Sequence, residues 1–461
     1  MTQNEAEKSS VDFNRRDFIK GASFGSLMLM MGGVPLQAED KPAATPADTN
    51  YSTVGASVSC AVIGCGIWGR EVIQTLNLLP NAPVVAICDT YKPFLNKAKG
   101  LAPKAEAFED YTKLLELKNV DAVIIATPTY LHREIAVAAL KAGKHVYCEA
   151  PLAHTIEDAR AIAQAAKAAE KVNFQCGLQM RSDPGKHFVL NFVRSGAIGH
   201  AVMARAQWHK QQCWRRTAPT PERELAVNWR LDTTTANGLM GEIGVHQVDL
   251  VNWFLNELPA ATTGFGGIFN PDCGDGRDVP DTIQSVMQYP SKVNFSYDCC
   301  LANSFDGEYN IIYGTYAAIM MRGNKAWLFK EANSPLLGWE IYATKVQFQD
   351  ETGITLAAGA SKSVQPGKVV EESPYADSTL HFALKAFVNN SNLTGTAVKN
   401  FFEVLNGDAD ELKPYLATLS KSRQPAAGYQ AGFEATVSAI KANEAVLKGQ
   451  KIMLPKDLFA I

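Results

Sequence analysis

The stretch VSCAVIGCGIWGREVIQTL, residues 58–76, decides the fold of this chain. It begins with an apolar run typical of a buried strand and ends with the spacing of an amphipathic helix. Between them, three glycines have the spacing G-x-G-x-x-G of a dinucleotide-binding turn. Gly64 permits the tight turn, Gly66 lets the backbone approach a pyrophosphate, and Gly69 allows the helix to pack close to the strand.

An acidic residue follows the next predicted strand. Residues 83–88 read PVVAIC and are followed by Asp89, twenty positions after Gly69. A carboxylate there accepts hydrogen bonds from an adenosine ribose and repels a 2′-phosphate, so we expect NAD rather than NADP. Lys92 could weaken that discrimination, and the alternative role for Asp89 is to cap the next helix.

Strand-like and helical runs alternate from residue 58 to residue 176. Apolar runs at 121–126 and 144–149 flank a helical pattern at 131–142. The alternation predicts an α/β Rossmann domain with a doubly wound parallel sheet, whose ligands bind beyond the carboxyl ends of the strands. The residues that we expect to bind the cofactor are Gly64, Gly66, Ile67, Trp68, Gly69, Asp89, Thr127, Pro128, His132 and Glu149.

Composition narrows the classes of partner. The 461 residues carry a formal net charge of -3, and no basic tract stands out, so we expect no nucleic-acid partner. The nine cysteines include no C-x-x-C pair, and several lie in or beside apolar runs. They are therefore interpreted as buried thiols rather than a disulfide framework, and no metal site is expected.

The N-terminal residues resemble a bacterial twin-arginine export signal. The run NRRDFIK at 14–20 precedes an apolar stretch that ends in a small-residue cleavage pattern at 36–38. We therefore expect a signal peptide at 1–38, a flexible linker at 39–56, and a periplasmic protein without a stable membrane anchor after processing. The alternative is an anchor that is never cleaved. Twin-arginine export carries folded proteins, which suits a protein loaded with its cofactor in the cytoplasm.

Further stretches resemble the glucose–fructose oxidoreductase, inositol dehydrogenase and rhizopine catabolism family. They are DAVIIATPTYLHREIAVAALKAGKHVYCEAPLA at 121–153, RSDPGKHFVLNFVRSGAIGH at 181–200, GLMGEIGVHQVDLVNWFL at 238–255 and IIYGTYAAIMMRG at 311–323. The resemblance covers about residues 57–330 clearly and the rest loosely. It implies that the Rossmann domain at 57–178 is followed by an α+β domain at 179–461 with an open, mostly antiparallel sheet that contributes to homo-oligomer contacts.

The sequence after the Rossmann domain agrees with that implication. Strand-like runs occur at 281–289, 293–301, 308–313 and 316–321. Residues 334–372 are polar and weakly patterned, so we expect an insertion or loop there. Helical stretches near 376–390 and 430–447 close the chain, and in the family such terminal helices often return to the first domain.

The resemblance also places the chemistry. Oxidoreductases of the family use the Lys of an E-K-P motif, then an Asp and a His four apart on one helix. Here the first motif is Glu149, Ala150 and Pro151, and the helix carries Glu242 and His246. A carbinol that loses hydride needs a base for its hydroxyl proton, and His246 can be that base. The alternatives are that His246 is a core histidine and that Glu242 is a solvated or salt-bridged side chain.

Other polar residues are candidates for the substrate pocket. They are Arg181 and Asp183 after the Rossmann domain, and Trp208 and Lys210 at the end of a predicted strand. Aromatic faces stack on sugar rings, and basic side chains bind hydroxyls or carboxylates. Lys210 is a candidate replacement for the Lys that is missing at Ala150.

Three functions remain open at this point. The first is an exported NAD-dependent oxidoreductase acting on a sugar or glycoside, with a non-dissociating cofactor that a second sugar or ketone reoxidises. The second is an NAD-dependent glycosidase that oxidises its sugar transiently before elimination, although residues 178–180 lack the Tyr that one such group supplies. The third is a non-catalytic carbohydrate-binding protein that retains NAD.

Overall fold

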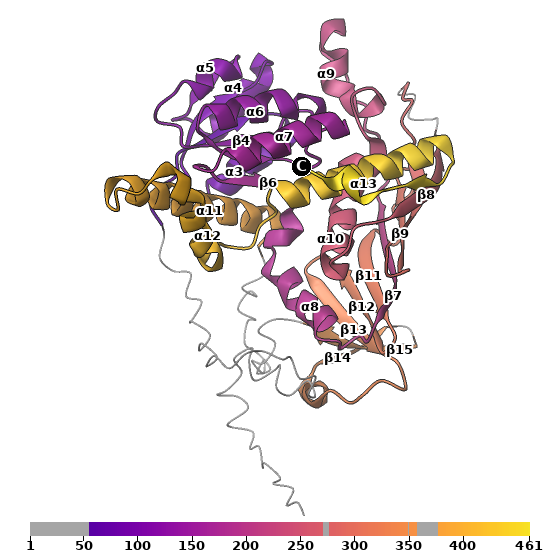
Figure 1. Ribbon diagram of the computed structural model, residues 1–461. Coiled ribbons are helices and arrows are strands. Elements are labelled where there is room, and N and C mark those ends of the chain that lie inside the picture. The colour runs from indigo at the N-terminus through magenta and orange to yellow at the C-terminus, as the bar shows by residue number, and fades with distance from the viewer. Residues whose placement is uncertain (1–54, 271–275, 349, 357–376) are drawn as a thin grey trace, which may run out of the picture.

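A computed structural model describes residues 55–270, 276–348, 350–356 and 377–461 (Figure 1). The expected signal peptide and nearly all of the expected linker lie outside the described residues. The chain folds around two sheets, each with its own apolar core.

The first sheet is parallel and has six strands in the order β3-β2-β1-β4-β5-β6. The strands are β1 (Cys60–Ile63), β2 (Val84–Cys88), β3 (Glu106–Phe108), β4 (Ala122–Ile125), β5 (His145–Cys148) and β6 (Phe174–Cys176). The connecting helices are α3 (Ile67–Leu76), α4 (Lys92–Leu101), α5 (Tyr111–Leu115), α6 (His132–Lys141) and α7 (Ile156–Ala168). The strand order reverses direction between β1 and β4, and the ligand crevice of a doubly wound sheet lies at such a reversal. The predicted Rossmann class is confirmed.

The second sheet has ten strands in the order β14-β15-β13-β12-β11-β7-β10-β9-β8-β16. They are β7 (Ala201–His209), β8 (Ala261–Gly267), β9 (Thr282–Gln288), β10 (Asn294–Cys300), β11 (Glu308–Gly314), β12 (Ala317–Arg322), β13 (Lys325–Lys330), β14 (Lys345–Phe348), β15 (Glu351–Leu356) and β16 (Ile452–Met453). β7 and β10 pair in parallel, and the other described pairs are antiparallel. This confirms the predicted open, mostly antiparallel sheet.

One face of the second sheet is covered by helices. The covering helices are α8 (Pro184–Arg194), α10 (Val245–Leu255) and α13 (Tyr429–Lys448). Alternate residues of β10, such as Phe295 and Tyr297, point into this core, because successive side chains of a strand face opposite sides. The described residues leave the other face uncovered, where Met203 and Val286 are exposed.

The C-terminal helices join the two domains (Figure 1). α11 (Thr379–Glu403) packs on the first domain, where the Phe387 ring lies 5.6 Å from the ring of Tyr147. The short α12 (Leu412–Thr418) follows it. α13 contacts α7 of the first domain as well as α10 and β8 of the second. The two sheets are therefore held at a fixed separation by packed helices.

The expectation of a loop at 334–372 is partly wrong. β14 and β15 lie within it and extend the edge of the second sheet, while residues 357–376 lie outside the described part of the chain. Every residue of β14 is exposed. An edge strand that buries neither face lacks the apolar alternation by which strands are predicted.

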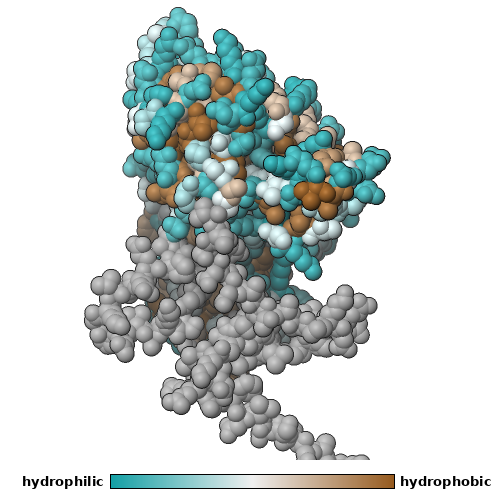
Figure 2. Space-filling model, turned by 90° about the vertical axis from the view of Figure 1, so that its left-hand side faces the viewer, coloured by the Kyte–Doolittle hydropathy of each residue, from teal (hydrophilic) through white to brown (hydrophobic). Residues whose placement is uncertain are grey.

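The surface is mixed in polarity. Figure 2 shows the side of the first domain, where hydrophilic surface is interrupted by apolar patches. Within the described ranges, no helix is both long and apolar enough to cross a membrane. Six of the eight described cysteines are buried, as the sequence predicts.

Candidate active site

The phosphate loop has the geometry that a dinucleotide needs. Gly64 has a φ of 94°, and a Cβ at Gly69 would overlap the carbonyl oxygen of Gly64. A Cβ at Gly66 would meet nothing within 4 Å, so open space lies where a pyrophosphate approaches. Among the described residues, no side chain caps the first turn of α3, which leaves its N–H groups for phosphate oxygens. Ile67 and Trp68 begin this helix and are exposed.

Asp89 lies at the carboxyl end of β2 and supports the loop. Its Oδ2 accepts a 2.7 Å hydrogen bond from the N–H of Cys65, and its Oδ1 accepts one of 2.8 Å from the N–H of Tyr91. Burial raises the pKa of this carboxyl, against the opposing effect of those bonds and of Arg223 and Arg70. Each oxygen has a further lone pair, so the carboxylate can still accept from a ribose hydroxyl.

The end of β4 is tied to the segment after β5 by His132. Its Nδ1 lies 3.1 Å from the carbonyl oxygen of Pro151, and its Nε2 lies 3.0 Å from that of Thr127. With both ring nitrogens against carbonyls and the ring buried, His132 positions the strand ends and has no nitrogen left for a dinucleotide. The buried Thr127 hydroxyl has no partner in the described part of the chain, so it can bond a ligand beside Pro128.

Glu149 follows β5 and is almost completely buried. Its Oε1 accepts a 2.8 Å hydrogen bond from the indole Nε1 of Trp68, and burial raises the pKa of the carboxyl to about 7. A side chain at Gly177 would collide with it, so this glycine leaves room for the carboxyl. The following Ala150–Pro151 peptide bond is cis.

Glu242 lies on a turn of π-helix, Met240–Gly244, that precedes α10. Such turns are rare and are frequent at functional sites. The Thr129 hydroxyl donates to both carboxylate oxygens, at 3.2 and 3.3 Å, and Nε of Arg230 lies 3.6 Å from Oε2. Burial raises the pKa of Glu242 to about 7, although Arg230 and Thr129 oppose the shift. A residue of the second domain thus reaches the carboxyl end of β4.

His246 lies in the first turn of α10 and is half-buried. Burial lowers the pKa of its imidazole to about 4, so the ring is neutral at neutral pH. Nothing in the described ranges hydrogen-bonds the ring, and the Glu242 carboxyl is directed to Thr129 and Arg230 instead. A neutral imidazole without a protein partner can accept a substrate proton.

Three of the four predicted substrate residues make contacts that support the fold: an ion pair, a helix cap and packing against a core. Arg181 makes a bidentate pair with buried Asp249 of α10, at 2.9 and 2.8 Å. Asp183 caps α8 by accepting from the N–H of Gly185. Trp208 packs against the apolar core of the second sheet, and Lys210 is exposed just after β7. In the part of the chain that the structure describes, no bond links Lys210 to the Glu149, Glu242 or His246 side chains.

The residues that sequence reasoning missed are Thr129, Tyr130, Trp229 and Arg230. The Trp229 ring lies 6.5 Å from the ring of Tyr130, and the Arg230 guanidinium lies 4.4 Å from the Trp229 ring. This aromatic and cationic group borders Glu242. In the sequence, the adjacent Trp229 and Arg230 only weakly indicate a binding site, because an aromatic residue beside a basic one is common both at carbohydrate sites and on ordinary surfaces.

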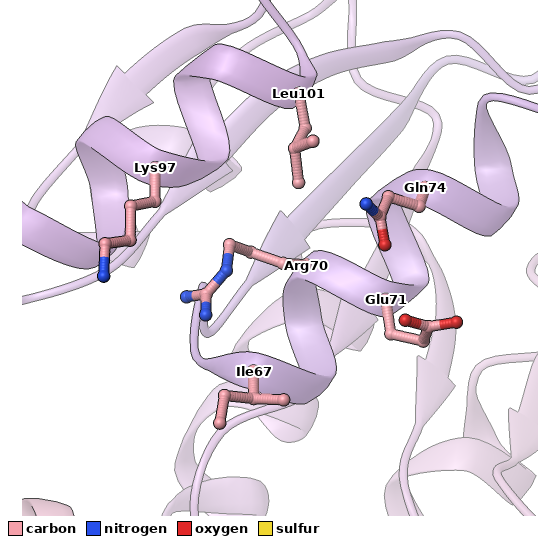
Figure 3. Close-up of a pocket in the computed structure, with 6 residues that line it drawn as sticks. All are labelled: Ile67, Arg70, Glu71, Gln74, Lys97 and Leu101. Atoms are coloured by element: carbon pink, nitrogen blue, oxygen red, sulfur yellow. The ribbon is translucent and has the colours of Figure 1, made fainter.

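A separate hollow of about 410 Å³ lies between α3 and α4 (Figure 3). Arg70 reaches into it from α3 and Leu101 from α4, and Ile67 and Lys97 are also among the lining residues. It contains neither Glu242 nor His246, so it is distinct from the candidate catalytic groups.

The fold and site define a two-domain, dinucleotide-binding protein, and comparisons with known proteins agree. Residues 58–177 match the family described as "Oxidoreductase family, NAD-binding Rossmann fold", and residues 189–320 match the "GFO/IDH/MocA C-terminal domain". Together the two matches span more than half of the chain. The protein belongs to the Gfo/Idh/MocA oxidoreductase family, and its first domain is an NAD-binding domain.

Two relatives illustrate the range of the family. 2,7-Anhydro-N-acetylneuraminate hydratase of Escherichia coli is 24% identical over 76% of this chain and 91% of that protein. Inositol 2-dehydrogenase of Salmonella typhimurium is 30% identical over 44% of this chain and 55% of that protein. Among solved structures, a levoglucosan dehydrogenase in complex with NADH and levoglucosan matches with a TM-score of 0.64 and 18% identity, over 87% of this chain and all of that one.

Proposed function

We propose that this protein is an exported NAD-dependent oxidoreductase that acts on a sugar or glycoside and keeps its cofactor bound between half-reactions. The carrying observation is that Glu242, one turn before His246, bonds to Thr129 at the carboxyl end of the parallel sheet. Dinucleotides bind at that edge, so two protonatable groups lie beside the expected nicotinamide. The names of the relatives, which specify inositol, levoglucosan and an anhydro sugar acid, support a carbohydrate substrate.

His246 and Glu242 each account for part of the proton transfer in this reaction. NAD, when bound, supplies a two-electron acceptor for the hydride of a carbinol C–H. The neutral His246 ring takes the hydroxyl proton, and the carbinol carbon becomes a carbonyl. Glu242 is close to half-protonated at neutral pH, so it can donate to one substrate oxygen or accept from another. The same proton transfer in reverse, on a second sugar or ketone, completes a ping-pong cycle.

A second candidate function has its own support. An NAD-dependent glycosidase or eliminating enzyme oxidises its sugar transiently, so that an adjacent C–H proton becomes acidic and a leaving group departs. Ala150 stands in place of the family's Lys, and a hydratase is among the relatives. Under this mechanism Glu242 or Glu149 would protonate the leaving group. A non-catalytic carbohydrate-binding protein remains the third alternative.

Two parts of the proposal concern the whole molecule. Export to the periplasm rests on the twin-arginine pattern at 14–20 and the cleavage pattern at 36–38. A homo-oligomer rests on the uncovered face of the second sheet, where Met203, Val286 and Phe265 are exposed. An uncovered sheet face with exposed apolar side chains is a typical subunit interface, and light scattering on the purified protein tests this.

Product analysis on the purified protein distinguishes the three functions. The bound dinucleotide is first identified by chromatography after denaturation. Sugars and aryl glycosides are then added singly while nicotinamide absorbance and released aglycone are followed. Reduction of the bound cofactor, reversed by a second sugar or ketone, supports the oxidoreductase. Aglycone release without net reduction establishes the glycosidase, and sugar binding without either signal establishes the non-catalytic protein.

A further inference from the structure

One segment of the second domain lies against the first domain at two places. Residues 210–231 leave the end of β7 and include the short helix α9 (Glu224–Asn228), which Figure 1 shows beside the first domain. Near the catalytic groups, Trp229 of this segment contacts Tyr130. Farther along the cofactor crevice, Nη1 of Arg223 donates a 3.2 Å hydrogen bond to the hydroxyl of Thr90.

Arg223 meets the first domain at the predicted adenosine end. Thr90 and Tyr91 directly follow Asp89, the residue positioned for the adenosine ribose. The Arg223 guanidinium lies 4.9 Å from the centre of the Tyr91 ring, within the range of a cation–π contact. Its charge also acts on the Asp89 carboxyl, together with that of Arg70. Arg223 is therefore the contribution of the second domain to this end of the crevice.

Part of the Arg223 guanidinium is still available. Its Nε is buried and has no hydrogen-bond partner among the described residues. A buried guanidinium N–H without an acceptor is costly, and it is satisfied when a ligand oxygen or ring nitrogen supplies one. The nearby ligand groups of a bound dinucleotide are the ribose hydroxyls and the adenine ring, both of which carry acceptors.

The segment that carries Arg223 is braced internally. Arg215 pairs with Glu224 at 2.6 Å. The Asn228 side chain accepts from the N–H of Arg216 at 2.8 Å and donates to its carbonyl oxygen at 2.9 Å. These bonds join residues 215–216 to residues 224–228, and Arg223 directly precedes the second of these stretches, so the bonds limit the movement of the backbone that carries it.

We propose that residues 210–231 are a clamp on the adenosine end of the cofactor, in which Arg223 closes over the ribose and adenine and slows dinucleotide release. The clamp acts on the NAD-binding domain and rests on the proposed function, because a cofactor that stays bound between half-reactions needs a barrier to its release. Substrate chemistry plays no part in it. A dinucleotide leaves only after Arg223 separates from Thr90 and Tyr91.

The test measures cofactor release without any sugar. The full protein is loaded with NADH and mixed rapidly with excess NAD, and energy transfer from protein tryptophan to NADH reports the dissociation rate. We expect Arg223→Ala to accelerate release roughly ten- to hundredfold, the scale of one lost charge-assisted hydrogen bond. Arg223→Lys should be intermediate, because it keeps the charge but loses the planar stacking surface.

Two further variants keep the test specific. Glu222→Gln is the matched control, since Glu222 lies on the same turn and its side chain bonds to Thr220 rather than to the first domain. It should release NADH at the wild-type rate. Tyr91→Leu removes the ring under Arg223, and its effect should be less than additive with Arg223→Ala. Wild-type release rates in folded Arg223→Ala and Arg223→Lys would overturn the clamp while leaving the sugar chemistry untouched.

Discussion

The indole Nε1 of Trp68 donates a 2.8 Å hydrogen bond to Oε1 of Glu149, joining the phosphate loop to the end of β5. These two residues are 81 positions apart in the sequence. Glu149 is the first residue of the motif that has lost its Lys, and no cation among the described residues acts on its carboxyl. Burial without a cation explains why its pKa rises to about 7.

The Glu149 carboxyl should make the protein less stable at alkaline pH. Its pKa rises from 4.5 unfolded to about 7 folded, so the stabilising, protonated form is fully present below about pH 4.5 and is lost as the pH rises through 7. Glu149→Gln keeps the acceptor for Trp68 and does not titrate. We expect it to lie within about 1 kcal/mol of the wild type at pH 5 and to exceed it at pH 8.5, by up to about 3 kcal/mol.

Thermal or urea unfolding at the two pH values checks this expectation. Glu170→Gln is a suitable control, because Glu170 lies on the surface, where it pairs with Lys413. The control should show the same difference from the wild type at both pH values. A Glu149→Gln variant that gains nothing at pH 8.5 would show that the carboxyl is ionised and well solvated in the folded state.

Glu242 should set a step in the pH dependence of turnover. Its carboxyl has a pKa of about 7, and the Thr129 hydroxyl stabilises the ionised form. Thr129→Val removes that donor, so the step should move to higher pH by up to about one unit. Thr129→Ser retains the hydroxyl and should leave the step in place. Glu242→Gln should remove it. A step unchanged in both Glu242→Gln and Thr129→Val would assign it to another group.

The sequence predicted the elements of the site better than their partners. The strand, glycine turn and helix at 58–76 are local, so periodicity and spacing suffice to find them. The pairing of Glu242 with Thr129, 113 positions away, depends on how the two domains pack. Arg181 was predicted as a substrate residue because it lies just after the Rossmann domain, and its pairing with Asp249, 68 positions away, could not be read from the sequence. Contacts that form only in the folded chain leave no local pattern.

Ala150→Lys should test what the missing Lys means. The substitution restores the E-K-P motif of the family at the end of β5, two residues before buried Leu152. We expect it to raise oxidation of a simple sugar, measured as reduction of bound cofactor, and to suppress any aglycone release. Ala150→Met is the matched control, since it has a similar length without the ammonium group. Equal behaviour of the Lys and Met variants would mean that only the added volume matters.

Replacement of the paired arginines should block export. Arg15→Lys together with Arg16→Lys keeps the charge and removes the twin-arginine pattern. We expect the precursor to accumulate in the cytoplasm, measured by immunoblot of separated periplasmic and cytoplasmic fractions. Lys8→Arg, upstream of the pattern, is the control and should leave export unchanged. Full periplasmic recovery of the double variant would reject the twin-arginine assignment.

His246 is the residue on which the proposed proton transfer depends most. Its ring is neutral above about pH 4 because burial lowers the pKa, and no described residue hydrogen-bonds it. His246→Ala should reduce turnover roughly 10²- to 10⁴-fold, the usual effect of losing a general acid–base group. Bound NAD should be retained, because α10 lies outside the phosphate loop. His246→Gln, which keeps a polar side chain but cannot take the proton, should be nearly as impaired. Single-turnover reduction of the bound cofactor measures the step directly, and cofactor content is determined on the same samples. Full activity in His246→Ala with the cofactor retained would place the base elsewhere, with Glu242 the first group to examine.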